Sequence, residues 1–161
     1  PKGVERFLEL VNTKFFDDQI MYRVMPGFIV QFGVAADPEV QKLWQESKFE
    51  DEPNKAKFDH GTVSFAGNGP NTRTCHIFIA FAPHGENLGS APHETTIGHV
   101  TESTHKTLLT IQKNYRKTKY PENLPLQMDL VYRGNVAAAK YPKLDRIVQC
   151  RLRVEGHTQE L

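Results

Sequence analysis

The chain has 161 residues, of which 39% are hydrophobic and 24% charged, and this composition predicts a folded globular protein rather than a disordered one. Twenty Lys and Arg residues against nineteen Asp and Glu residues give a formal net charge of +1, which argues against a dedicated nucleic-acid binder. No apolar run approaches the roughly 18–20 residues that cross a bilayer. We therefore expect a single domain over residues 1–161, with no membrane span in this chain and no nucleic-acid partner.

The first half of the chain carries two helical patterns around a strand pattern. Residues 1–12 predict a helix, because apolar side chains recur at helical spacing at Val4, Phe7, Leu8 and Val11. In the segment 22–33, the Pro26–Gly27 pair predicts a turn, and the apolar run that follows predicts a buried strand. Asp37 is a suitable N-cap for a short helix over residues 38–46.

The second half is richer in strand patterns. Strands are expected at 62–66, 76–81 and 95–100, a helix at about 103–116, and a closing strand at 144–153. The Gly-, Asn- and Pro-rich residues 67–72 predict a loop. Residues 120–142 form an atypical excursion, in which Gln127–Tyr132 alternates well enough to contribute a strand. The sum predicts a mainly β protein with two or three helices, of the α+β or barrel class.

Pattern alone assigns few residues to a site. None of the seven histidines has the paired spacing of a metal motif, and the two cysteines match no metal or redox spacing, so we expect no metal. Arg23 fits an arginine that covers apolar surface and keeps its head group in water. Gln31 is an amide inside an apolar run, and it is either a satisfied core residue or a ligand contact. Phe65 and Phe78 fit core positions on the same ground.

Two long stretches resemble the signature motifs of the cyclophilins, the peptidyl-prolyl cis-trans isomerases. Tyr22–Gly33 is similar to the family strand F-H-R-[IV]-[IV]-P-G-F-[MI]-x-Q-G-G, and Gly61–Ile79 is similar to G-x-[LV]-S-M-A-N-x-G-P-N-T-N-x-S-Q-F-F-I. Shorter matches follow the same order at Phe49–Glu52, Thr96–Val100 and Ile147–Cys150. Two long motifs in the right order and at compatible spacing make a chance match very unlikely.

The resemblance implies a closed antiparallel β-barrel capped by two helices, with a proline-binding groove on its outside and no cofactor. Matched position by position, Arg23 is the catalytic arginine, and the other groove positions are Phe28, Ile29, Gln31, Phe65, Gly67, His76, Phe78 and Leu88. In the family pattern Phe28, Ile29 and Phe78 line the proline pocket, and Gln31 binds the substrate backbone. The implied partners are proline-containing peptide or protein segments.

Several groove positions depart from the family pattern. Gly67 stands where the family has Asn, His76 where it has Gln, and Asn87 where it often has Trp. The family's active-site His corresponds to either His93 or Glu94. We therefore expect an isomerase with an altered groove and weak activity. The alternative is a catalytically impaired binding or structural subunit of a larger assembly.

The start of the chain also departs from the family. Pro1–Phe7 resembles the beginning of the family's first helix, which two strands precede in the family. Three explanations compete: the chain is a fragment, the hairpin was not observed, or residues 120–142 fill the gap; we favour the fragment. The final Glu–Leu resembles an ER-retention signal, but Thr158 stands where a basic residue is usual. The compartment stays open, with the secretory pathway or an organelle among the options.

Overall fold

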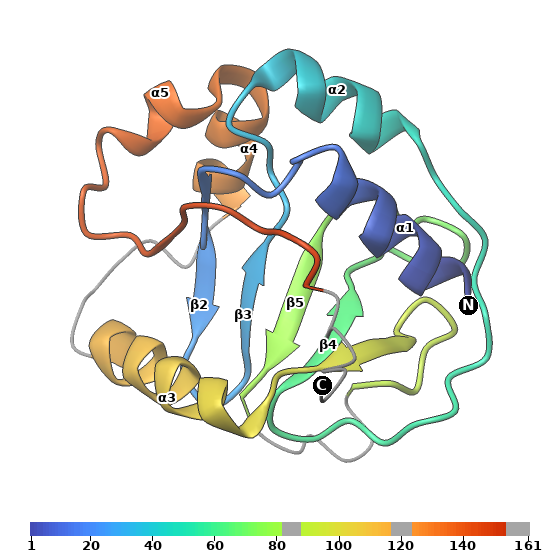
Figure 1. Cartoon of the computed structure of the whole chain (residues 1–161). Helices are drawn as coiled ribbons and strands as arrows, with labels where there is room; N and C mark the ends of the chain where they lie inside the picture. Colours follow the sequence, from blue (N-terminus) through green and yellow to red (C-terminus); the bar gives the residue numbers. More distant parts are fainter. Residues whose placement is uncertain (82–87, 117–123, 154–161) are drawn as a thin grey trace, which may run out of the picture.

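The structure, a computed structural model, describes residues 1–81, 88–116 and 124–153, and its centre is a five-stranded antiparallel sheet (Figure 1). The strands follow the order β2-β3-β5-β4-β6 across this sheet. They are β2 (Arg23–Met25), β3 (Ile29–Phe32), β4 (Thr62–Phe65), β5 (Ile77–Ala80) and β6 (Thr96–His99). A second, two-stranded antiparallel sheet joins β1 (Gln19–Ile20) to β7 (Arg146–Ile147). The order leaves β2 and β6 at the two edges of the larger sheet.

Five helices surround the sheet in the described residues. They are α1 (Lys2–Asn12), α2 (Pro38–Glu46), α3 (Glu102–Arg116), α4 (Leu124–Arg133) and α5 (Asn135–Ala138). In Figure 1, α2, α4 and α5 gather at one end of the sheet, while α1 and α3 lie across it. The helix α2 begins as expected, because the Asp37 side chain accepts a hydrogen bond from the Glu39 amide at 2.8 Å. No described helix is both long and apolar enough to cross a membrane.

The register of the strands separates two faces of the large sheet. On one face Arg23 pairs with Gln31, and Gln31 pairs with Phe78. Because side chains alternate along a strand, Val30 and Ile77 point to the opposite face. Val30 packs with residues of α3, and Ile77 packs with residues of α1, so the two helices cover this opposite face. The arginine and the glutamine therefore project away from the part of the core that α1 and α3 cover.

Most predicted elements are confirmed, but two predictions about the second half were wrong. Gln127–Tyr132 lies in helix α4, not in a strand, because Leu126 and Leu130, four residues apart, bury one helix face against Tyr22 and its neighbours. The expected closing strand at 144–153 is reduced to the two residues of β7. The β-sheet architecture with helices is confirmed at that level.

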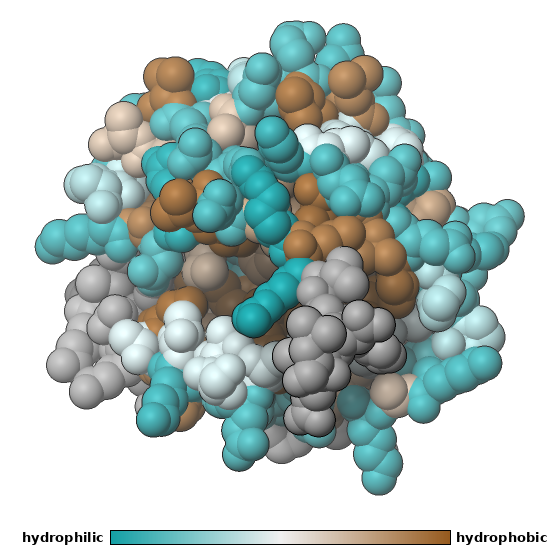
Figure 2. Space-filling view, in the orientation of Figure 1, coloured by the Kyte–Doolittle hydropathy of each residue, from teal (hydrophilic) through white to brown (hydrophobic). Residues whose placement is uncertain are grey.

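The closed barrel stays a prediction. The described strands form an open sheet in which β2 and β6 do not pair with each other. The face seen in Figure 2 is hollowed between α1 and α3, and hydrophobic side chains border the hollow. The strands that would close a barrel would have to bridge these two edges.

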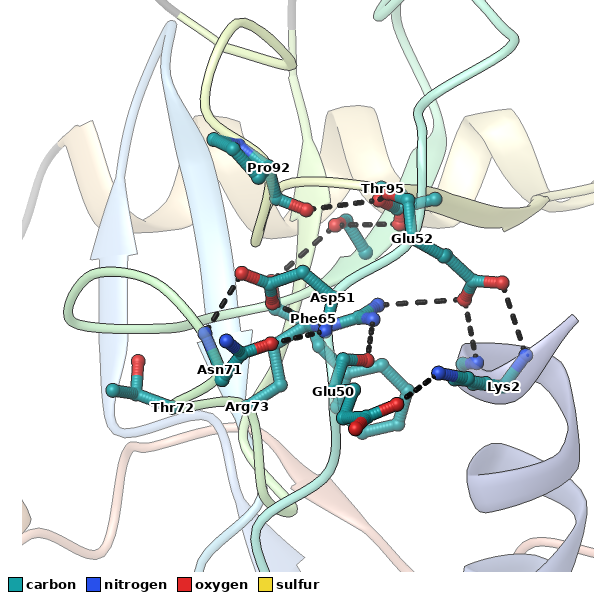
Figure 3. Close-up of polar contacts among 12 residues, drawn as sticks. Lys2, Glu50, Asp51, Glu52, Phe65, Asn71, Thr72, Arg73, Pro92 and Thr95 are labelled. Atoms are coloured by element: carbon teal, nitrogen blue, oxygen red, sulfur yellow. Dashed lines mark hydrogen bonds and ion pairs between the residues drawn. The ribbon is translucent and has the colours of Figure 1, made fainter.

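A buried arginine holds three segments together beside the start of α1 (Figure 3). Arg73 is 0% exposed and forms ion pairs with Asp51 at 3.3 Å and Glu52 at 3.5 Å. It also donates to the Glu50 carbonyl at 2.6 Å, and its guanidinium lies 4.4 Å from the centre of the Phe49 ring. The Glu52 carboxylate in turn accepts from the first backbone amides of α1, at Lys2 (3.0 Å) and Gly3 (2.7 Å). This arginine therefore links α1, residues 49–52 and the loop that leads into β5.

Gly33 offers a test of the packing between β3 and β5. Its φ of +110° belongs to the region that L side chains rarely adopt, and a Cβ there would lie 2.4 Å from the Cys75 carbonyl oxygen. We expect Gly33→Ala to lower the free energy of unfolding by about 2–3 kcal/mol in urea denaturation, because backbone strain and a backbone clash add. Gly69→Ala is the matched control, since Gly69 has a φ of +102° but open space around it. An equal loss in both variants would show that the close approach at Gly33 contributes nothing.

Candidate functional site

A pocket with a volume of about 950 Å³ opens on the face of the sheet that carries Arg23. The sheet and the following loop contribute Arg23, Gln31, Ala66, Gly67, Asn68 and His76 to its lining. The remaining lining residues are Tyr22, Gln45, Lys48, Thr72, Thr74 and Gln127. The pocket therefore brings together four residues that the family resemblance assigned to the groove, namely Arg23, Gln31, Gly67 and His76.

Arg23 and Gln31 are joined side by side on neighbouring strands. The Arg23 guanidinium donates to the Gln31 Oε1 atom at 3.0 Å, and the two residues are direct partners in the β2–β3 ladder. Gln31 is 7% exposed, so its side chain has little freedom. Because Oε1 is occupied by the arginine, the amide NH₂ of Gln31 is the group left to donate to a ligand. The pair thus presents a fixed guanidinium and a fixed amide donor to the pocket.

His76 is oriented by a buried tyrosine. The Tyr22 hydroxyl lies 3.1 Å from His76 Nδ1, and it has no other hydrogen-bond partner among the described residues. Burial raises the pKa of Tyr22 well above its usual value, so the phenol keeps its proton. Since Nδ1 is the one acceptor for that proton among the described residues, the hydroxyl donates to Nδ1. Burial also lowers the pKa of His76 to about 4, so the imidazole is neutral at physiological pH. The remaining proton then sits on Nε2, and His76 can donate to a ligand as the glutamine of the family pattern would.

The predicted proline-pocket residues form an apolar cluster beside this pocket. Ile29, Phe78 and Leu88 are buried together with Phe58 and Ala80, and Phe28 and Ala66 pack against them. Phe58 stacks on Phe78 with ring centres 6.0 Å apart. Ala66 belongs to both groups, since it also lines the pocket. The structure therefore brings the apolar groove residues together, but as a buried cluster next to the pocket and not as its lining.

Phe65 is the predicted groove residue that the structure places elsewhere. It is 0% exposed and packs in the core with Leu10 and Ile77, on the face that α1 covers. The strand alternation explains this, because Ser64 and not Phe65 points to the face that carries Gln31 and Phe78. The assignment of Phe65 to the groove was wrong, and the core position expected from pattern alone is confirmed.

The two alternatives for the family's histidine separate clearly. The ring of His93 packs on Gly67 so closely that a Cβ at residue 67 would lie 3.0–3.2 Å from it. The asparagine of the family pattern would crowd this ring, so the glycine and the histidine suit each other. Glu94 instead accepts a hydrogen bond from the Gly89 amide at 2.8 Å. His93 therefore borders the candidate site, while Asn87 lies outside the described residues.

Sequence reasoning missed the second half of the pocket wall. Gln45 and Lys48 come from the end of α2 and the residue pair after it, and Gln127 comes from α4. Phe58, which covers Phe78, was missed as well. None of these residues lies in a stretch that resembles the family motifs, and their polarity alone marks them as ordinary surface residues. Only the packing of α2 and α4 on the end of the sheet reveals them.

The described residues contain no group of three or more His, Cys, Asp or Glu side chains arranged to hold a metal ion. Cys75 and Cys150 are free thiols. Burial raises the pKa of the Cys75 thiol to about 11, so it is an unreactive core residue at neutral pH. The candidate site therefore offers hydrogen-bond donors and an apolar cluster.

The neutral state of His76 predicts a loss of stability in acid. The unfolded chain binds a proton at this histidine near pH 6.5, whereas the folded chain resists protonation until about pH 4. The stabilisation is therefore complete above pH 6.5 and is lost as the pH falls towards 4, and the loss amounts to about 2.5 kcal/mol by pH 4.5. Urea denaturation at a series of pH values should show this loss in the wild type and a flatter profile in His76→Gln.

Two other histidines define the background of that measurement. Burial lowers the pKa of His60, which adds to the loss of stability in acid. Hydrogen bonds to the Val100 carbonyl and to Asp59 raise the pKa of His99, which acts in the opposite direction because its contribution is lost as the pH rises. Both remain in His76→Gln, so the difference between the two profiles isolates His76. Identical profiles would contradict the burial of a neutral imidazole.

Comparison with known proteins agrees with the resemblance to the cyclophilins seen in the sequence. The model of the family described as cyclophilin type peptidyl-prolyl cis-trans isomerase matches residues 1–132. A peptidyl-prolyl cis-trans isomerase-like 3 from Neurospora crassa is 34% identical over 100 residues, which are 56% of this chain and 60% of the relative. A protein of the same name from Rhizopus delemar is 31% identical over 128 residues, which are 70% of each chain. This chain thus spans about 60% of the length of the Neurospora relative.

Solved structures include similar chains as well. A crystal structure of a cyclophilin type peptidyl-prolyl cis-trans isomerase from Cryptosporidium parvum aligns with a TM-score of 0.49 and 27% sequence identity, over 65% of this chain and 67% of that one. A second crystal structure of the Cryptosporidium protein, in the presence of the dipeptide Ala-Pro, aligns with the same TM-score and 28% identity.

Proposed function

Because this chain belongs to the cyclophilin-type peptidyl-prolyl cis-trans isomerase family, we propose that it accelerates rotation about X–Pro peptide bonds in peptides or proteins. The observation that supports this activity best is the Arg23–Gln31 pair, which lines a pocket next to an apolar cluster. Rotation makes and breaks no covalent bond, so the proposal calls for no cofactor. The substrates would be proline-containing segments of peptides or proteins.

The catalytic role falls to Arg23. Rotation about the amide bond passes a barrier of about 18–20 kcal/mol, because conjugation between the carbonyl and the nitrogen is lost on the way. In the twisted state the proline nitrogen becomes pyramidal and gains a free lone pair. A guanidinium N–H that donates to this lone pair stabilises the twisted state and not the planar ground state, which is the condition for acceleration. The hydrogen bond to Gln31 fixes the guanidinium and leaves its other N–H groups for the substrate.

Binding falls to the donors and the apolar surface around Arg23. The Gln31 NH₂ and the His76 Nε2–H would hold carbonyl groups of the substrate backbone. Phe28 and Ala66 are partly exposed and rest on the cluster of Ile29, Phe78 and Leu88. We infer that the proline ring packs on this apolar rim, which keeps the X–Pro bond within reach of Arg23.

The departures from the family pattern favour one alternative. Gly67 brings no side-chain amide to the pocket, and His76 replaces a second amide. A chain with these changes would bind proline segments as a subunit of a larger assembly without useful catalysis. Constant stoichiometry in a purified complex, together with an isomerisation rate equal to the uncatalysed one, would favour this second function.

We also propose that the sheet is part of a closed barrel. Within the described residues β2 and β6 are edge strands, and strands that bridge them would also cover the hydrophobic hollow between α1 and α3. Such strands would leave the pocket open, because Arg23 and Gln31 lie on the other face of the sheet.

A protease-coupled assay on a short proline peptide tests the activity. The protease cleaves only the trans peptide, so the slow phase of cleavage reports isomerisation. We expect the protein to shorten this phase in proportion to its concentration. A slow phase that stays at the uncatalysed rate, with peptide binding still detectable by NMR, would leave only the binding function.

A further inference from the structure

The pocket extends well beyond the Arg23–Gln31 pair, and its lining carries positive charge. Arg23 and Lys48 are its two charged lining residues, and no carboxylate is among the lining residues of the described structure. Neither cation forms an ion pair with any described residue. The acidic residues nearest to Lys48 in the sequence do not compensate it, since Glu46 is outside the lining and Glu50 pairs with Lys2.

Hydrogen bonds within the protein turn two glutamines of this pocket into donors. Gln31 Oε1 accepts from Arg23, which has no acceptor atom, so the free group of Gln31 is its NH₂. Gln41 Oε1 accepts from the Ala35 amide at 2.8 Å, so its NH₂ must be the group that faces Gln45 Oε1 at 3.3 Å. Gln45 is thereby left with its NH₂ free. The hydrogen-bonding groups of the partners therefore determine that the NH₂ group is the free end of both amides.

His76 follows the same pattern. Tyr22 occupies its Nδ1, which leaves Nε2–H as the donor. The hydroxyl groups in the lining are already used, because Thr72 donates to the Gly69 carbonyl and Thr74 donates to the Cys75 sulfur. The free groups in the pocket are therefore two cations, three neutral donors, and the amides of Asn68 and Gln127, which can donate or accept.

The wall that carries Lys48 is held in place. The Arg6 guanidinium donates to the Ser47 carbonyl at 2.5 Å and to the Thr74 carbonyl at 3.3 Å, which fastens the end of α2 to the loop before β5. On the opposite side, Gln127 belongs to a turn of α4 whose neighbour Leu126 is buried. Walls whose backbone is held before the ligand arrives lower the cost of ordering the pocket on binding.

We propose that this pocket takes an acidic side chain, Asp or Glu, of the proline-containing segment, and this inference rests on the proposed function. A carboxylate offers only acceptor lone pairs and a negative charge, which match a lining of free donors and cations. A lysine or arginine of the substrate would face two like charges and no carboxylate. The pocket thus selects proline segments that carry an acidic residue near the proline.

The test measures the binding of proline heptapeptides by NMR titration of the whole chain. Each peptide carries one glutamate or one glutamine, moved in turn through the three positions before and after the proline. At the preferred position we expect the glutamate peptide to bind about three- to tenfold more tightly than its glutamine partner. This ratio should fall towards one in about 0.5 M NaCl, where the screening length is about 4 Å.

Two variants on α2 and the residues after it locate the effect. Lys48→Glu should abolish the preference for glutamate, whereas Lys42→Glu should keep it, because Lys42 is an exposed residue of α2 outside the pocket lining. An equal loss in both variants would overturn the inference, since the preference would then come from the overall charge. Equal binding of glutamate and glutamine peptides at every position would also overturn it, while leaving the isomerase function intact. Failure of every proline peptide to bind would overturn both.

Discussion

Replacing Arg23 with alanine should lower kcat/KM for isomerisation of a proline peptide by about 100- to 1000-fold, which is the usual effect of removing one fixed donor from a transition state. The loss should appear in kcat, while peptide affinity should change by only a few-fold. The reason is that the arginine donates to the proline nitrogen only when the bond is twisted. Arg23 is partly exposed and forms no ion pair with described residues, so the fold should tolerate the change. The protease-coupled assay and a parallel peptide titration measure both quantities.

Arg23→Lys separates charge from geometry. Lysine keeps the positive charge, but its ammonium is a mobile group that cannot hold Gln31 and reach the substrate in one plane. We expect it to lose nearly as much activity as alanine. Arg133→Ala is the matched control, because Arg133 is a partly exposed arginine whose partner, Asp129, lies outside the pocket lining. Full activity in Arg23→Ala would remove Arg23 from the catalytic role.

Arg73→Ala should cost about 3–5 kcal/mol of unfolding free energy. The guanidinium is fully buried, and its removal leaves the carboxylates of Asp51 and Glu52 in a largely buried place without their partner. It also removes the donor to the Glu50 carbonyl and the group that packs over Phe49. Urea denaturation followed by circular dichroism measures the change.

Arg133→Ala is also the control for the loss of stability in Arg73→Ala, because it breaks an exposed ion pair. Arg133 and Asp129 form an ion pair four residues apart on α4, with side chains 44% and 30% exposed. Exposed pairs of this kind contribute little, so Arg133→Ala should change the unfolding free energy far less than Arg73→Ala does. The two variants remove the same side chain and differ in burial. A loss in Arg73→Ala as small as that in Arg133→Ala would mean that the buried pair contributes little beyond its desolvation cost.

The sequence predicted elements best where local signals were sufficient. The apolar stripe of α1 and the Asp37 cap of α2 are local features, and both helices lie where they were expected. The segment Gln127–Tyr132 fits both periods, since Leu130 belongs to an alternating pattern as well as to a helical one. The structure decides for the helix, because Met128 and Tyr132, which a strand would bury with Leu130, are 44% and 71% exposed. Only the contact with Tyr22 and Val34, far away in the chain, makes this choice.

The site residues likewise fall into those that local sequence identifies and those that only the structure reveals. Arg23, Gln31, Gly67 and His76 lie in motif stretches, and position-by-position matching was enough to name them. Phe65 was misplaced because a motif letter does not state which face of the strand a side chain occupies. The wall formed by Gln45, Lys48 and Gln127 depends on how two helices pack on the end of the sheet. No local pattern encodes that arrangement, so these residues had to come from the structure.

The Tyr22 side chain makes two kinds of contact. Its ring packs against Leu126 and Leu130 of α4, and its hydroxyl forms a hydrogen bond with the imidazole of His76. Substitutions in α4 can therefore change ligand recognition, although no family motif passes through that helix. Among divergent sequences, residues that line the inner side of α4 should co-vary with the identities at positions 22 and 76. Selection on substrate choice could then act through a helix that never touches the rotating bond.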